Sequence, residues 1–170
     1  WGTRLLRALP AMRLREARRW APRVEEAWRR EDRELDVETR AAVGRCLSLG
    51  GRLEAACEVL EGLREERGGA RETRLAALRE LGEVLQRSSR VDEAAEVFRS
   101  ISERNPRYMP SRLNMGSCLL ALGMNDEARK LFEGVLKKSP ASPEARTNLA
   151  VLKLLGGKSD DGVEMLKKII

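Results

Sequence analysis

The 170-residue chain contains no histidine and few aromatic residues, which make up only 4% of it. The commonest side chain for general acid–base catalysis, which is also the commonest zinc ligand, is therefore missing. β-strands favour aromatic and β-branched residues, and aromatic residues are scarce here, whereas charged residues make up 35% of the chain. The composition argues against a β-sandwich and favours long amphipathic helices rich in Ala, Leu, Glu and Arg.

The chain also lacks an apolar run of about 18 residues, so we predict no membrane span. Its three cysteines, Cys46, Cys57 and Cys118, are odd in number and widely spaced, which argues against a disulfide framework. We interpret all three as small core residues of a protein in a reducing compartment. The predicted location is intracellular, in the cytoplasm or an organellar matrix such as that of the mitochondrion. Because the chain begins at Trp1, a removed leader and a longer parent protein both stay open.

The formal net charge of +6 is concentrated at the N-terminus, because residues 1–23 hold seven arginines and one glutamate. This basic N-terminal patch could hold RNA phosphates, an acidic partner or anionic lipid. A solvated helix face is the competing interpretation. We favour it because arginine supplies most of the basic residues of the whole chain, so its abundance near the N-terminus reflects a general bias in composition. The patch consists of Arg4, Arg7, Arg13, Arg15, Arg18 and Arg19.

Residues of matched size recur every 34 positions, which indicates tandem repeats. A further copy lies upstream at an offset of 38 positions, because the stretch 67–71 lengthens one turn. The columns are Gly44, Gly82, Gly116 and Ala150; Ala56, Ala94, Ala128 and Gly162; Leu60, Phe98, Phe132 and Leu166; Leu63, Ile101, Val135 and Ile169; and Pro106 and Pro140.

Each copy predicts two antiparallel helices. The first carries apolar residues at helical spacing and ends near 88–89, Gly123 or 156–157. The second begins with an acidic turn and ends before a proline, because the residue preceding proline avoids helical geometry. We expect the small residues to face each other where the helices cross, Gly116 against Ala128 and Ala150 against Gly162. Phe132 should then fill the space towards the next repeat.

This pattern resembles the tetratricopeptide repeat (TPR) family. The resemblance covers about residues 37–170 and implies an all-α fold, a right-handed α-solenoid of antiparallel helix pairs (a TPR-like superhelix). It departs from the family where Leu78, Arg112 and Arg146 replace a bulky aromatic residue early in the first helix. The residues that carry the resemblance most clearly are Met115, Gly116, Leu119, Gly123, Ala128, Phe132, Val135 and Pro140.

The predicted repeats are 37–70, 75–108, 109–142 and 143–170, and an Arg-rich region, 1–36, precedes them as a degenerate repeat or cap. Within that region we predict two helices, 11–20 and 22–34, with Pro22 in the first turn of the second. Val24, Trp28 and Leu35 should pack on the first repeat. At the other end, Leu166, Ile169 and Ile170 would leave an apolar edge that a continuing chain or a partner covers.

In the TPR family, the first helix of each pair lines a concave groove that holds an extended or helical partner segment. Asn114 and Asn148 are equivalent residues of adjacent repeats, and they resemble the asparagine ladder of O-linked N-acetylglucosamine transferases, whose amides can pair with any peptide backbone. Asparagines that serve only their own helix or solvent are the competing interpretation. Carried over by position, the groove residues are Arg45, Arg79, Glu83, Asn114, Ser117, Asn148 and Val151.

A second family precedent is the clamp that holds the terminal carboxylate of a chaperone tail. Arg79 and Asn114 could contribute to such a clamp. However, Glu144 and Asn148 stand where it needs paired basic residues, and the Glu144 carboxylate would repel a carboxylate ligand. The sequence therefore argues against this use of the groove.

No catalytic constellation is recognisable in the sequence. The acidic pairs at 126–127 and 160–161 stand at predicted helix starts, and the paired glycines at 68–69 and 156–157 precede no phosphate-binding motif. We therefore predict that the protein is not an enzyme, needs no cofactor or metal, and takes no small-molecule substrate.

The predicted function is that of a non-catalytic scaffold or adaptor for protein–protein interaction. It would bind a partner segment in the concave groove or serve as a structural subunit of a larger complex. Two alternatives stay open. One is a nucleic-acid-associated subunit, for example of an organellar ribosome, that docks on RNA or an acidic partner through the basic N-terminal patch. The other is the TPR domain of a larger enzyme.

Overall fold

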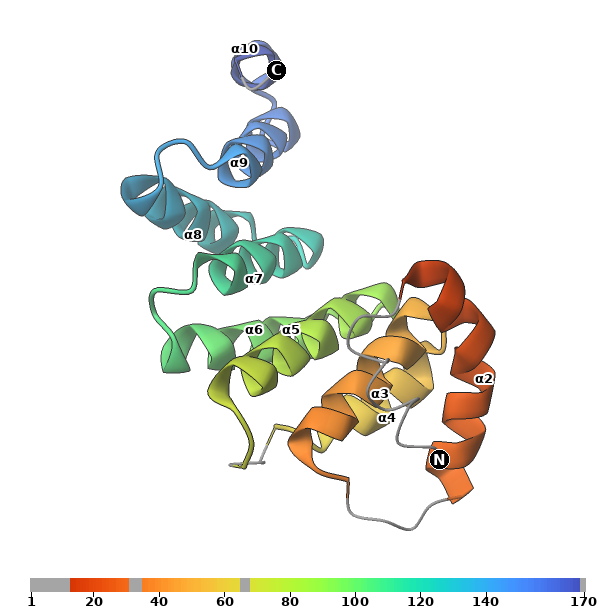
Figure 1. The fold of residues 1–170 in the computed structure, drawn as a ribbon. Coiled ribbons are helices and arrows are strands. Elements are labelled where there is room, and N and C mark those ends of the chain that lie inside the picture. The colour runs from red at the N-terminus through yellow and green to blue at the C-terminus, as the bar shows by residue number, and fades with distance from the viewer. Residues whose placement is uncertain (1–12, 31–34, 65–67, 169–170) are drawn as a thin grey trace. The chain divides into compact units, whose positions relative to one another are not determined.

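The computed structural model describes residues 13–30, 35–64 and 68–168, and all of the regular secondary structure in these ranges is α-helical (Figure 1). This confirms the expected all-α fold. The helices are α2 (Leu14–Arg30), α3 (Val37–Leu49), α4 (Leu53–Glu61), α5 (Arg71–Arg87), α6 (Val91–Arg104), α7 (Met109–Ala121), α8 (Asn125–Lys138), α9 (Pro143–Leu155) and α10 (Ser159–Lys167).

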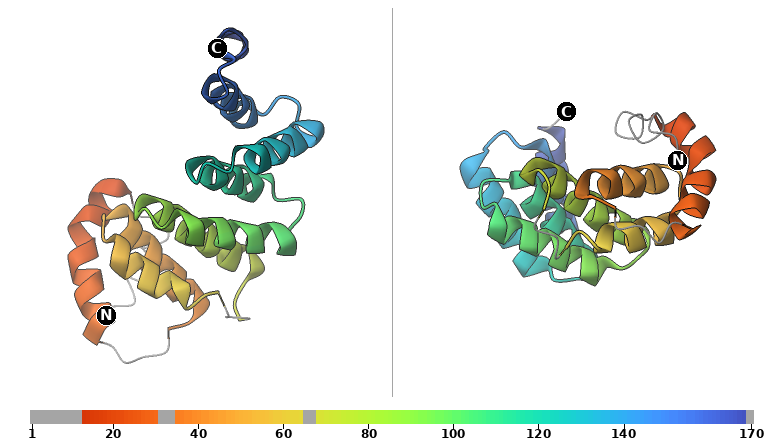
Figure 2. Two further views of the ribbon diagram at one scale, coloured as in Figure 1. Left: turned by 180° about the vertical axis from the view of Figure 1, so that it is seen from behind. Right: turned by 60° about the horizontal axis from the view of Figure 1, so that its bottom comes forward.

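The chain divides into two compact units, Trp1–Arg90 and Val91–Ile170, here called the first and second unit. In the first unit, α2 packs on α3, α3 packs on α4, and both α3 and α4 contact α5. In the second unit each helix from α6 to α10 packs on the next, and α7 also contacts α9. Figure 2 shows the same neighbours from two further sides. Within each unit, consecutive helices thus pack in pairs, as TPR helices do.

The helix ends follow the predicted turn signals. After α7, the N–H of Met124 donates to the carbonyl of Leu119 at 2.8 Å, and Gly123 adopts φ +75° between them. This is the geometry of a helix end closed by a left-handed residue. Gly51 and Gly157 adopt the same conformation after α3 and α9, whereas α5 uses Ser89 with φ +61°.

The second helices of the pairs also begin and end where the sequence predicted. Acidic residues occupy the first turns of α6, α8 and α10, where they favour the helix N-terminus. The helices α6 and α8 stop two residues before Pro106 and Pro140 respectively. These boundaries depend on local chemistry, which explains why the sequence alone could place them.

The prediction of two helices in the N-terminal region was wrong, because α2 is continuous and contains Pro22 in its interior. Proline at this position removes one backbone hydrogen bond of the helix. Burial on one face outweighs that loss, since Ala17, Ala21 and Val24 are completely buried and α2 packs against α3. The approach is close: a Cβ on Gly50, after α3, would overlap the methyl group of Ala21.

The expected apolar stripe is confirmed at Val24 of α2, which is fully buried. Trp28 of α2 is half-buried, and so is Leu35, which lies between α2 and α3. The guanidinium of Arg29 lies 5.5 Å from the centre of the Trp28 ring, a cation–π distance. At the other end of the chain, Leu166 is half-buried, and Ile169 and Ile170 lie outside the described residues. The predicted apolar edge there stays a prediction.

The crossing inside the third predicted repeat differs in detail from the expectation. A Cβ on Gly116 would lie 2.6 Å from Cε1 of the Phe132 ring, so the partner of Gly116 in α8 is Phe132, one turn beyond the predicted Ala128. Gly44 likewise approaches the side chain of Leu60. In the last pair, a Cβ on Gly162 would lie 3.0 Å from the carbonyl oxygen of Ala150, as predicted, but it would lie nearer, at 2.8 Å, to the side chain of Leu154, one turn further along α9.

Phe132 also belongs to a buried cluster that joins α7, α8 and α9, as expected for a residue that packs towards the next repeat. Its companions from α9 are Ala145, Leu149 and Leu152. The three cysteines are buried and free, as predicted for core residues. Burial raises the pKa of the Cys46 thiol to about 11, so this thiol stays protonated and unreactive near neutral pH.

Candidate partner-binding surfaces

A groove of about 290 Å³ lies between α3 and α5 of the first unit. Alanines from both helices form its floor, because residues without long side chains leave space between two packed helices. Charged residues stand around this floor. The groove, here called the α3–α5 groove, is lined by Glu38, Ala41, Ala42, Arg45, Thr73, Ala76, Ala77, Arg79 and Glu80.

Most charged groups of the α3–α5 groove already have partners within the first unit. Arg79 Nη1 lies 2.8 Å from Glu83 Oε1, one turn along α5. Glu80 Oε1 accepts a hydrogen bond of 2.6 Å from the buried hydroxyl of Ser48. Glu38 Oε1 accepts one of 3.1 Å from the backbone N–H of Ala70.

Arg45 differs from the other charged residues of the groove. It is exposed on α3, and no residue in the described part of the chain forms an ion pair or a hydrogen bond with its guanidinium. A guanidinium offers five N–H donors in a planar arrangement that matches carboxylates and carbonyl groups. Arg45 is therefore the groove residue best placed to hold an incoming acceptor.

The structure brings three predicted groove residues together in the first unit, where Arg45 and Arg79 line one groove and Glu83 pairs with Arg79. The other four lie on α7 and α9 of the second unit, two helices that contact each other. All four are half-buried. They are Asn114 and Ser117 on α7, and Asn148 and Val151 on α9.

The polar side chains among these four differ in their hydrogen bonds. The Ser117 hydroxyl donates to the carbonyl of Leu113 in its own helix at 3.1 Å. Neither the Asn114 nor the Asn148 amide forms a hydrogen bond with any residue of the described ranges. Both amides keep a donor and an acceptor available.

The basic N-terminal patch is only partly visible, because Arg4 and Arg7 lie outside the described residues. Arg13, Arg15, Arg18 and Arg19 are exposed. Exposure of this kind fits a solvated helix face and leaves the charge accessible to an acidic ligand. The patch therefore gains no specific geometry that would favour RNA.

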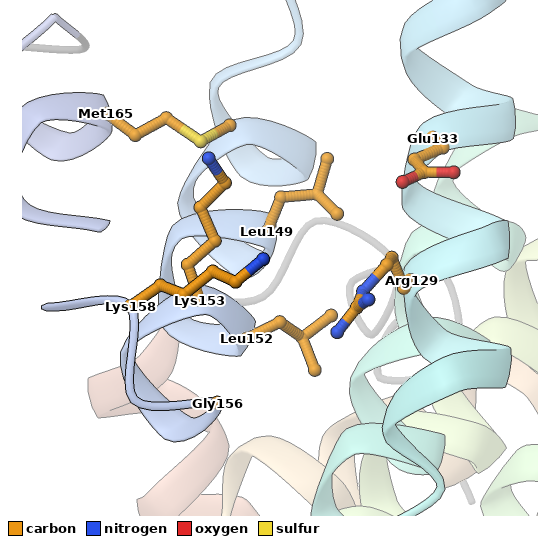
Figure 3. Close-up of a pocket in the computed structure, with 8 residues that line it drawn as sticks. All are labelled: Arg129, Glu133, Leu149, Leu152, Lys153, Gly156, Lys158 and Met165. Atoms are coloured by element: carbon orange, nitrogen blue, oxygen red, sulfur yellow. The ribbon is translucent and has the colours of Figure 1, made fainter. Parts of the chain in front are cut away.

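A second pocket, of about 310 Å³, lies between α8, α9 and α10, and Figure 3 shows the side chains around it. Sequence reasoning missed it, because its residues come from three helices and share no spacing in the sequence. Leu149 and Leu152 form an apolar floor and are 9% and 2% exposed. This basic pocket is lined by Arg129, Glu133, Leu149, Leu152, Lys153, Gly156, Lys158 and Met165.

Two further observations concern metal ligands and membrane-spanning helices. Within the ranges that the structure describes, no group of three or more Cys, Asp or Glu side chains is placed to hold a metal ion. None of the helices described is both long enough and apolar enough to cross a bilayer.

Proteins of known structure share the fold of this chain. No curated protein sequence matches the chain. MamA MSR-1 superposes with a TM-score of 0.73 at 21% identity, over 96% of this chain and 89% of MamA. YrrB, described as "a TPR protein with an unusual peptide-binding site", gives 0.72 at 22% identity, over 97% and 81%. A tetratricopeptide repeat protein from Parabacteroides merdae gives 0.73 at 17% identity, over 88% and 57%. At these identities the likeness shows the fold.

The sequence itself matches two profiles, both described as tetratricopeptide repeat, over residues 79–143 and 119–170. The two matches together span residues 79–170, which is more than half of the chain, and they include the repeats with the strongest predicted pattern. The chain therefore belongs to the tetratricopeptide repeat family, whose members mediate protein–protein interactions.

Proposed function

We propose that this protein is a non-catalytic scaffold or adaptor that binds a segment of a partner protein along the first helices of its repeats. The observation that carries the proposal is the α3–α5 groove, where the guanidinium of Arg45, which has no partner among the described residues, stands beside a floor of alanines. The peptide-binding site named for YrrB, a protein of similar fold, supports a peptide as the ligand. In the residues that the structure describes, no catalytic domain is evident.

The α3–α5 groove suits a short peptide better than a folded domain. Its volume of about 290 Å³ holds a few side chains at most. The floor of Ala41, Ala42, Ala76 and Ala77 offers apolar contact to one bulky side chain of the ligand. Arg45 would then hold a carbonyl or carboxylate of the same segment.

The amides of Asn114 and Asn148 extend the proposal to the second unit. Each can donate to a peptide carbonyl and accept from a peptide N–H, whatever the peptide sequence. Their lack of partners among the described residues supports this role. We also propose that the repeats are 37–70, 75–108, 109–142 and 143–170, with α2 of the N-terminal region capping α3.

The proposal is tested by affinity capture of partners from the native source, followed by mass spectrometry. The bait is the full chain, either unchanged or carrying Arg45→Gln. The matched control is Arg99→Gln, an exposed arginine of α6 with no partner in the described part of the chain. We expect Arg45→Gln to lose a stoichiometric partner that the control retains.

The amides are tested separately by combining Asn114→Ala with Asn148→Ala. We expect an unchanged helical circular dichroism spectrum and weaker capture of the same partner. Equal recovery of the partner with all of these variants would contradict binding along the first helices.

A further inference from the structure

We propose that the basic pocket between α8, α9 and α10 is a second docking site, which receives an acidic residue next to a large apolar residue in a segment of a partner protein. It is separate from the first-helix surface of the proposed function. On α9, the pocket is lined by Leu149, Leu152 and Lys153, whereas the proposed peptide contacts on that helix are Asn148 and Val151, which do not line the pocket.

The geometry places two cations over an apolar floor. Figure 3 shows the guanidinium of Arg129 extending from α8 and the ammonium of Lys158 extending from the turn before α10, both into the space beside Leu149 and Leu152. Met165 closes the pocket from α10. Gly156 also lines the pocket and contributes no side chain to it.

The cationic residues of the pocket differ in whether they form ion pairs. Lys153 Nζ lies 3.3 Å from Asp161 Oδ2. Among the described residues, the ion-pair partner of Arg129 is Asp126, at 4.0 Å, and both side chains are about half exposed or more, so the pair is weak. Lys158 has no partner in the residues that the structure describes. Arg129 and Lys158 therefore leave positive charge available, and an anion between them would gain two charge-assisted contacts.

The apolar floor and the rim decide which anion fits. Buried leucines favour a ligand that brings its own apolar side chain, which a free inorganic anion does not. Glu133 on the rim repels a doubly charged phosphate more strongly than a singly charged carboxylate. A volume of about 310 Å³ admits one apolar side chain with an adjacent carboxylate. These features together select Asp or Glu beside Leu, Met or Phe.

The test selects peptides from a random-peptide display library on the immobilised full chain and measures their affinities in solution. The pocket variant combines Arg129→Gln with Lys158→Gln. The control combines Lys130→Gln with Lys137→Gln, two exposed lysines of α8 outside the pocket, and removes the same charge. Glutamine keeps a helix propensity close to that of lysine and arginine.

We expect one class of selected peptides to carry Asp or Glu next to a large apolar residue. These peptides should bind the pocket variant roughly tenfold more weakly than the unchanged chain or the control. Their affinity should also fall as salt concentration rises. Gly156→Leu, which adds a large side chain to the lining without changing charge, should weaken the binding of the same peptides.

Three results would overturn the proposal: selected peptides without acidic enrichment, equal losses in the pocket variant and the control, or unchanged binding in Gly156→Leu. Arg45→Gln separates this site from the α3–α5 groove, because it should leave these peptides unaffected. Thermal melting of each variant identifies any loss of binding that comes from unfolding.

Discussion

Two glycines of neighbouring helices allow a sharp test of how α7 and α8 pack. Gly116 lies in α7, and a Cβ there would lie 2.6 Å and 2.7 Å from two carbons of the Phe132 ring. Gly134 lies in α8, where a Cβ would meet nothing within 4 Å. Replacing each by alanine adds one methyl group to a helix, so the two variants differ only in what that group meets.

The magnitudes follow from opposing contributions. Alanine is favoured over glycine in a helix by about 1 kcal/mol, and this gain applies at both positions. At Gly116 the ring of Phe132 is fully buried, and overpacking a core costs about 1–3 kcal/mol. A contact as short as 2.6 Å belongs at the upper end of that range. We expect Gly116→Ala to lower the unfolding free energy by about 1–2 kcal/mol, and Gly134→Ala to raise it by about 0.5–1 kcal/mol.

The assay is urea and thermal denaturation followed by far-ultraviolet circular dichroism. The melting temperatures should move in opposite directions, by about 2–4 °C for each kcal/mol. Gly116→Leu should destabilise by about 2 kcal/mol or more through the same overlap. If Gly116→Ala were as stable as the unchanged chain while Gly134→Ala gained stability, the packing of Phe132 on Gly116 would be refuted, and with it this crossing of α7 and α8.

Two further predictions concern a helix end and a buried thiol. Ser89→Gly should raise the unfolding free energy by about 0.5–1 kcal/mol, because Ser89 adopts φ +61° where the equivalent turns use glycine. A lower unfolding free energy for this variant in urea denaturation would contradict the expectation. For Cys46, burial raises the pKa from its ordinary value of 9.0 to about 11, so the contribution of the protonated thiol to stability should be complete below pH 9 and be lost as pH rises to about 11. The fall in the urea midpoint across that window should be shallower in Cys46→Ala, and identical slopes would argue against a buried Cys46 thiol.

The N-terminal region shows where reasoning from local signals stops. Pro22 favours a helix start, and the sequence therefore predicted two helices. The continuous α2 depends on Ala17, Ala21 and Val24 meeting α3 and Gly50, which are distant in the sequence. The burial of these residues against α3 therefore outweighed the preference of Pro22 for a helix start, and local sequence patterns do not show which surface α2 packs on.

For the candidate sites too, the sequence predicted some features, and others depend on how the helices pack. Arg45 and Arg79 were predicted as groove residues through the family resemblance, because the first helix of each repeat has a fixed position in the pattern. In the structure both line one groove. The resemblance carried no information about which charges are already paired. The bond of Glu80 to Ser48 and the pair of Arg79 with Glu83 emerge only from the packed helices.

By itself, the sequence determined the helix-pair repeat, its turns and its family, because spacing, acidic first turns, glycines and prolines act over a few residues or recur at a set period. Only the tertiary structure decided that Phe132 packs on Gly116, that α2 passes through Pro22, and that Arg129 and Lys158 share one pocket. Each of these depends on side chains from separate helices meeting in space, and the rotation of one helix against another sets which residues meet.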